Sequence, residues 1–172
     1  SSAIRLDNPE LATAQQRQIP VVRRATVLAA LVQRQRGICV AGMHGKTTTA
    51  ALLAYALDRL GAEPSYAVGA AVPQLERHAR FSCSSDASQR TGASRWFAVE
   101  ADESDGSFLK LSSTIAVVTN IDDDHLDYYQ TISKLKQSFI EHINRIPFYG
   151  FAILCSDDPG IRTILNKIRK RY

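Results

Sequence analysis

A glycine-containing turn between an apolar segment and a helical segment most constrains the fold of this chain. Residues 42–48 read Gly-Met-His-Gly-Lys-Thr-Thr, after the apolar residues 37–41 and before the Ala- and Leu-rich residues 47–60. Glycines let backbone N–H groups face phosphate oxygens at a helix N-terminus, so this order indicates a phosphate-binding loop. Lys46 would then reach the β- and γ-phosphates of a nucleotide, and Thr47 would hold Mg²⁺.

The loop departs from the usual GxxxxGK[ST] pattern at one position. Val40 stands where that pattern has its first glycine, so the loop has the shorter form GxxGKT. The alternative interpretation is a glycine turn that caps a helix beside an incidental lysine. The order of strand, turn and helix favours the phosphate-binding loop.

Apolar runs alternate with helical patterns along the rest of the chain. Such alternation is typical of a parallel sheet that helices cover on both faces. We therefore predict an α/β fold, a P-loop nucleotide-binding domain with a mostly parallel sheet flanked by helices. Ligands of these sheets bind at the carboxyl ends of the strands. The predicted strands span residues 37–41, 65–72, 96–99, 114–119 and 151–155, and the predicted helices span residues 47–60, 132–146 and a last segment capped by Asp158 and Pro159.

Two regions differ from this pattern. Residues 1–36 combine a capped helix start at residues 7–10, a short strand at 19–22 and a helix at 25–35, and we interpret them as the end of another unit. The expected domains are therefore residues 1–36 and residues 37–172. Residues 77–94 show little periodicity and predict an exposed loop or hairpin.

Acidic residues gather directly after two of the predicted strands. Eight of the 17 acids lie in residues 100–105 and 122–127, which read EADESD and DDDHLD. A carboxylate at the end of a strand, such as Glu100, is well placed to approach a metal ion beside the phosphates. Solvated acidic loops are the alternative for both segments. On residue type alone His125 suits a structural role better than Mg²⁺ binding, and the other acids of the first cluster, Asp102, Glu103 and Asp105, cannot be ranked.

Composition disfavours several classes of protein. The chain has 172 residues, 45% of them apolar and 22% charged, which indicates a folded chain. The net charge is +4, but the basic residues are scattered before the last helix, which disfavours nucleic-acid binding. No run approaches the roughly 18 apolar residues of a membrane span, and the first residues show no charged-then-apolar signal pattern, so we expect neither a membrane span nor secretion. The three cysteines form no CxxC pair, which indicates reduced thiols in a cytoplasmic protein.

From the residues alone, a kinase, an NTPase and an ATP-dependent ligase all remain open. Four motifs in order narrow the choice: GxHGKTTT, EADESDxSFL, TNIxxDHLDxY and PFYG. Together they resemble the Mur ligase family, over roughly residues 37–172, which correspond to its central ATP-binding domain. Residues 1–36 look like the tail of its N-terminal UDP-binding domain, and the family's C-terminal ligase domain is expected to be absent.

The resemblance implies an ATP-dependent amide-bond ligase of cytoplasmic peptidoglycan synthesis. The branch that it looks closest to joins L-alanine to UDP-N-acetylmuramate through an acyl phosphate. The alternatives are a ligase that recycles an intact tripeptide onto the same nucleotide sugar, and a nucleotide-binding module that does not ligate. The Asn-Gly-Gly segment common in the family is replaced by Val68-Gly69-Ala70.

The resemblance also implies roles for individual residues. Lys46, Glu100 and His125 are the expected catalytic residues, and Thr47, Glu100 and His125 are the expected Mg²⁺ ligands. No partner is implied beyond the small-molecule substrates, and the oligomeric state is left open. The expected ATP-binding residues are Gly42, Met43, His44, Gly45, Lys46, Thr47, Thr48 and Asn120.

Overall fold

The strands of the chain form a single sheet in the computed structural model, which describes residues 4–5, 7–82, 96–123 and 126–172. Within these residues the sheet has six strands in the order β3-β2-β4-β1-β5-β6. Only β3 runs antiparallel, to its neighbour β2. The predicted α/β fold with a mostly parallel sheet is therefore confirmed. The strands are β1 (Arg36–Ala41), β2 (Ser65–Ala67), β3 (Ala79–Arg80), β4 (Trp96–Glu100), β5 (Ser113–Val118) and β6 (Phe151–Leu154).

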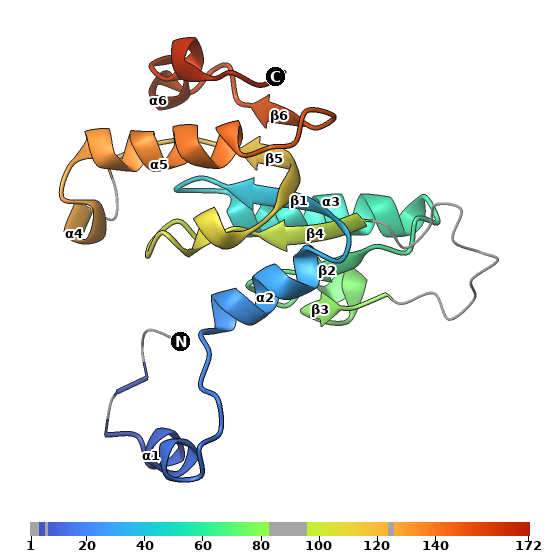
Figure 1. Ribbon diagram of the computed structural model, residues 1–172. Coiled ribbons are helices and arrows are strands. Elements are labelled where there is room, and N and C mark those ends of the chain that lie inside the picture. The colour runs from blue at the N-terminus through green and yellow to red at the C-terminus, as the bar shows by residue number, and fades with distance from the viewer. Residues whose placement is uncertain (1–3, 6, 83–95, 124–125) are drawn as a thin grey trace.

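Helices cover both faces of this sheet (Figure 1). The α-helices are α1 (Pro9–Gln16), α2 (Arg24–Val32), α3 (Lys46–Arg59), α4 (Leu126–Tyr129), α5 (Ile132–Asn144) and α6 (Pro159–Arg162). Short 3₁₀ turns are η1 (Pro73–Leu75), η3 (Ser107–Lys110) and η4 (Leu165–Lys167). Helix α1 contributes no buried residue, and Figure 1 shows it apart from the sheet.

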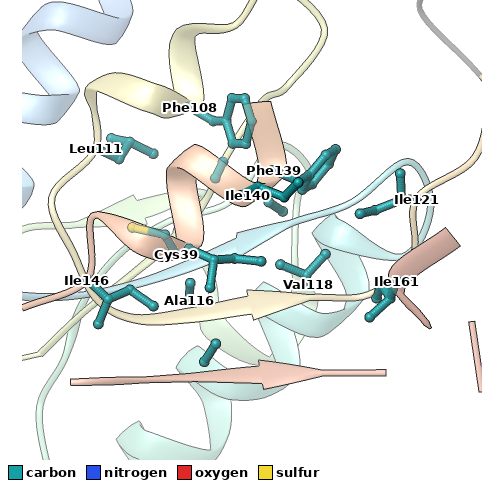
Figure 2. Packing of buried hydrophobic residues seen from close by; sticks show 14 of the residues in the cluster. Cys39, Phe108, Leu111, Ala116, Val118, Ile121, Phe139, Ile140, Ile146 and Ile161 are labelled. Atoms are coloured by element: carbon teal, nitrogen blue, oxygen red, sulfur yellow. The ribbon is translucent and has the colours of Figure 1, made fainter. Parts of the chain in front are cut away.

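Alternating residues of β1 divide the core into two layers. Cys39 and Ala41 belong to the larger cluster, and Val40 between them belongs to the smaller one. This follows from the period of two in a strand, which sends successive side chains to opposite faces. The larger cluster includes Leu135 and Phe139 of α5, and Figure 2 shows Phe139 close to Phe108 of η3.

The smaller layer lies under α3. Ala50 and Ala54 of this helix are fully buried against Val40 and Tyr66. Small alanine side chains allow a helix to lie close to the strands beneath it. The phosphate loop that precedes α3 is therefore held between a buried strand and a buried helix.

The structure agrees with the predicted helix caps. The side chain of Asn8 accepts hydrogen bonds from the N–H groups of Glu10 and Leu11, and Asp158 caps α6 through Ile161. Pro159 occupies the first turn of α6, as predicted. The last helix is shorter than expected, because it ends at Arg162 and a 3₁₀ turn follows.

The strand predicted at residues 19–22 is wrong. Ile19, Val21 and Val22 are each more than half exposed, and no strand of the described chain pairs with them. Pro20 lacks an N–H group, which disfavours pairing in the middle of a strand. The strand predicted at residues 65–72 also ends early, at Ala67.

Part of the predicted loop or hairpin at residues 77–94 lies outside the described residues. Within the described part, β3 pairs with β2 through Tyr66 and Arg80, so this segment begins as an antiparallel pair. None of the helices described is both long and apolar enough to cross a bilayer.

Candidate functional site

Three neighbouring parallel strands end beside one another at the carboxyl edge of the sheet. Strand β1 leads into Gly42, β4 ends at Glu100, and β5 leads into Thr119 and Asn120. The register places Glu100 beside Val40, and hence next to the start of the loop. The predicted meeting of phosphate loop and acidic segments at one edge is observed for Glu100 and for the residues after β5.

The phosphate loop depends on backbone conformations that glycine favours. Gly42 has φ +135°, and a Cβ atom there would lie 2.1 Å from Oγ1 of Thr119. Gly45 has φ +79° and forms the N-cap of α3. Among the described residues no side chain caps this helix. Its first N–H groups are thus able to bind an anion, which the helix dipole also favours.

Asn120 holds the loop by two hydrogen bonds to His44. Its side-chain Oδ1 accepts from the N–H of His44 at 2.8 Å, and its Nδ2 donates to the carbonyl oxygen of His44 at 2.9 Å. The hydroxyl of Thr119 donates to the same carbonyl oxygen at 2.7 Å. The segment after β5 therefore fixes the path of the loop.

The loop exposes some of its side chains and buries others. Met43 is buried in the larger core cluster, while His44 and Thr48 are exposed. Met43 takes part in the loop through its backbone, because its carbonyl oxygen accepts a hydrogen bond from Nζ of Lys46 at 3.2 Å. An apolar side chain therefore fits this position.

The ammonium group of Lys46 has three acceptors. Nζ donates to the carbonyl oxygen of Gly42 at 2.7 Å and to that of Met43, and it pairs with Oε1 of Glu103 at 2.8 Å. The side chain of Lys46 is 15% exposed, and that of Glu103 is fully buried. Burial raises the pKa of Glu103, and the hydrogen bond from Lys46 lowers it in part.

Glu100 joins the start of α3 to the segment after β2. Its Oε1 accepts from the hydroxyl of Thr47 at 2.9 Å, and its Oε2 accepts from the N–H of Gly69 at 2.8 Å. A Cβ atom on Gly69 would lie 2.7 Å from Oε2 of Glu100, so a larger residue there would displace the carboxylate from this position. The glycine of the Val68-Gly69-Ala70 segment thus positions Glu100.

These groups surround a cavity of about 400 Å³ at the strand ends. Lys46 and Glu100 line it together, with Asp102 and Ser104 from the segment after β4. Arg24, the first residue of α2, lines it as well. Asn120 is not among the lining residues and acts on the loop instead.

The predicted site residues separate into three groups. Lys46 and Glu100 line the cavity and the hydroxyl of Thr47 donates to Glu100, whereas Gly42, Met43 and Asn120 shape the loop. His44, Gly45 and Thr48 lie on the exposed side of the loop. His125 lies outside the described residues. No group of three or more His, Cys, Asp and Glu side chains in the described ranges is placed to hold a metal ion.

Glu103 is the site residue that sequence reasoning could not select. The hydroxyl of Tyr129 in α4 donates a hydrogen bond to the main-chain oxygen of Glu103. A cluster of four acids does not reveal which member is buried.

Residues 40–172 match the family model described as the Mur ligase middle domain, and residues 1–36 match the one described as Mur ligase family, catalytic domain. UDP-N-acetylmuramate–L-alanine ligase of Syntrophotalea carbinolica is 45% identical over 172 residues, which cover 100% of this chain and 35% of the relative. The protein of that name from Myxococcus xanthus is also 45% identical, over 100% of this chain and 34% of its own length. The chain thus spans about a third of the length of these relatives.

Solved structures share the fold. UDP-N-acetylmuramate:L-alanyl-γ-D-glutamyl-meso-diaminopimelate ligase of Neisseria meningitides has a TM-score of 0.80 at 23% identity, over 96% of this chain and 53% of its own. UDP-N-acetylmuramate–alanine ligase of Thermotoga maritima has a TM-score of 0.78 at 23% identity, over 94% of this chain and 35% of its own. The middle-domain model matches most of the chain and the fold agrees with it, so this chain belongs to the Mur ligase family.

Proposed function

We propose that this chain is part of an ATP-dependent ligase that joins L-alanine to UDP-N-acetylmuramate in peptidoglycan synthesis in the cytoplasm. The observation that carries the proposal is the meeting of Lys46 and Glu100 at one cavity, with the hydroxyl of Thr47 2.9 Å from Oε1 of Glu100. Its support from relatives is the 45% identity, over the whole chain, to proteins with that name. A pocket that combines a phosphate loop with carboxylates suits a nucleotide with its metal ion.

In this proposal the loop binds the phosphates of ATP. The uncapped N-terminus of α3 and Nζ of Lys46 would neutralise phosphate charge on the same side of the cavity. The cavity of about 400 Å³ has room for the phosphates and the reacting carboxylate at the strand ends. The MurF ligase of Thermotoga maritima, which shares this fold, was solved in complex with ADP.

The residues also fit Mg²⁺. Thr47 and Glu100 bring a hydroxyl oxygen and a carboxylate oxygen within 2.9 Å of each other, and Mg²⁺ prefers such oxygen ligands. Two protein ligands are enough, since the phosphates and water complete the coordination of this ion. Bound there, Mg²⁺ would supply charge neutralisation for the phosphates. By resemblance, His125 is proposed for a second Mg²⁺ near the substrate carboxylate.

The protein's own part in the reaction is to bring two anions together. The carboxylate of UDP-N-acetylmuramate must approach the γ-phosphate of ATP, and Lys46 would offset the repulsion between them. Attack forms the acyl phosphate and releases ADP. The amine of L-alanine then forms the amide bond at the acyl carbon, and phosphate leaves.

The proposed domain division is residues 1–36 for the end of the UDP-binding unit and residues 37–172 for the ATP-binding unit. In the structure the two are in contact, because Leu28, Ala29 and Leu31 of α2 pack against the larger core cluster. Arg24 at the start of the same helix reaches the cavity. A substrate held by the first unit could therefore meet ATP at this cavity.

A second candidate is the ligase that attaches an intact tripeptide to the same nucleotide sugar. The Neisseria meningitides structure with TM-score 0.80 carries the name of such an enzyme. Ser104 favours the alanine ligase, since the recycling enzymes tend to have tyrosine at this position of the acidic motif. In this chain the backbone N–H and hydroxyl of Ser104 both donate to Oδ1 of Asp102, which a tyrosine could reproduce only in part.

The test is phosphate release by the full-length protein with Mg-ATP and UDP-N-acetylmuramate. One reaction contains L-alanine, and a parallel reaction contains the tripeptide. Release that depends on L-alanine is expected. Release only with the tripeptide would favour the second candidate, and ATP binding without release in either reaction would indicate a non-ligating nucleotide-binding module.

A further inference from the structure

The carboxylate of Glu103 is the only charged acceptor that contacts Lys46 in the described part of the chain. The three N–H donors of the ammonium group match its three acceptors, Gly42, Met43 and Glu103. A phosphate oxygen can therefore accept a hydrogen bond from Lys46 only after one of these partners is released.

We propose that Glu103 is a positioning residue that holds Lys46 in the phosphate loop until a nucleotide binds and is then replaced there by the terminal phosphates of the nucleotide. This inference rests on the proposed ATP site. It assigns a role to a buried carboxylate that would otherwise oppose the binding of a triphosphate.

The geometry indicates which partner leaves. The carbonyl oxygens of Gly42 and Met43 belong to the loop, whose path is fixed by Asn120. Glu103 belongs to the segment between β4 and η3, and its carboxylate is an anion like the phosphates. A phosphate oxygen can thus replace Oε1 as the third acceptor of the ammonium group, while the loop keeps its path.

Lys46 moves more easily than Glu103. The hydroxyl of Tyr129 donates to the main-chain oxygen of Glu103, and the side chain of Glu103 is fully buried. Lys46 carries its charge on a flexible four-carbon stem and is partly exposed to the cavity. The ammonium group is therefore expected to swing toward the phosphates while Glu103 keeps its position.

This exchange lowers the affinity for nucleotides. Binding breaks a charge-assisted hydrogen bond and leaves a buried carboxylate without its ammonium partner. Glu103→Gln keeps the size of the side chain and an acceptor oxygen but removes the charge. We expect this variant to bind Mg-ATP and Mg-ADP about tenfold more tightly, the size of one charge-assisted hydrogen bond. Damage to the fold would instead weaken binding.

The experiment is calorimetric titration of the wild-type chain and the variant with Mg-ATP, Mg-ADP and AMP. AMP lacks the terminal phosphates, so Glu103→Gln should leave its affinity unchanged. Asp105→Asn is the matched control, because it removes a nearby negative charge that does not contact Lys46. It should change each affinity less than about twofold, as expected for a partly exposed charge.

Affinity for Mg-ATP that is unchanged or weaker in a folded Glu103→Gln variant would overturn the inference and leave the ATP site intact. A wild-type chain that binds no nucleotide would contradict the proposed function and this inference together. A second measurement needs no variant: a crystal structure of the wild type with Mg²⁺ and a non-hydrolysable ATP analogue. Nζ of Lys46 should contact phosphate and lie beyond hydrogen-bond distance of Glu103, whereas a retained pair would overturn the exchange.

Discussion

The hydroxyl of Thr47 lies 2.9 Å from Oε1 of Glu100, although the two residues are 53 positions apart in the sequence. This pair joins the start of α3 to the end of β4 beside the cavity. Thr47→Val removes the hydroxyl at nearly constant volume. In the full-length protein we expect the Mg²⁺ concentration for half-maximal ligation to rise about tenfold, as for loss of one oxygen ligand or its neighbour.

Thr47→Ser is the control for this prediction, because it keeps the oxygen. It should stay within about twofold of wild type in a magnesium titration. An equal Mg²⁺ requirement in wild type and Thr47→Val would contradict the assignment of Thr47.

Removal of the loop lysine should abolish most of the activity. We expect Lys46→Ala to lower kcat of the full-length protein by at least ~10²-fold, as for loss of one preorganised donor in the transition state. Lys134→Ala is the control, since Lys134 lies on α5 and contacts only Gln130 with its ammonium group in the described structure. A Lys46→Ala variant within about threefold of wild type would refute the role of Lys46.

Two asparagines allow a matched test of the hydrogen bonds by which Asn120 holds the phosphate loop. Asn120 makes two hydrogen bonds to His44, and Asn144 makes an equivalent pair, to Lys167 and Arg169, away from the site. Each change to alanine should lower the free energy of unfolding by about 1–2 kcal/mol. Only Asn120→Ala should also weaken ATP binding, measured by calorimetry. Equal ATP affinities in the two variants would show that the hydrogen bonds of Asn120 to His44 do not shape the site.

The buried His142 predicts a pH-dependent stability. The centroids of the His142 and Phe108 rings lie 4.9 Å apart. Burial and the charge of Arg145 lower the pKa of His142 from 6.5 to about 4. Between these values the unfolded chain binds a proton that the folded chain does not, so stability falls as the pH falls from about 6.5 to about 4. The stability lost between neutral pH and about pH 4 is at most about 3 kcal/mol, from the size of the pKa shift.

Urea unfolding of wild type and His142→Gln across this pH range measures the effect. The variant should show a flatter pH dependence than wild type between pH 6.5 and about 4. His78→Gln is the control, because His78 is exposed. Identical pH profiles for wild type and His142→Gln would exclude His142 as the source.

Local sequence patterns predicted most of the fold, because they report on burial and turn chemistry. The strand before Gly42 and the helix after it lie within one residue of their predicted bounds. The wrong strand prediction at residues 19–22 has a cause that is not local in the sequence. An apolar run becomes a strand only where another strand offers hydrogen bonds, and the sequence does not show which strands are neighbours.

Sequence reasoning identified a site residue only where the residue type and its motif indicate a specific chemical role. Lys46, Thr47 and Glu100 follow from the loop motif and from the strand that ends in an acid. Glu103 does not, because its burial depends on the turn between β4 and η3 and on contact with α4. Such tertiary contacts leave no local pattern in an acidic segment.

The most direct measurement follows one oxygen atom through the proposed reaction. The full-length protein is incubated with Mg-ATP, L-alanine and UDP-N-acetylmuramate whose carboxylate carries ¹⁸O, and the released phosphate is examined by mass spectrometry. Ligation through an acyl phosphate moves one carboxylate oxygen into each phosphate, so labelled phosphate is predicted. Amide product with unlabelled phosphate would contradict the acyl-phosphate route, and labelled phosphate that appears with the tripeptide but not with L-alanine would contradict the proposed substrate.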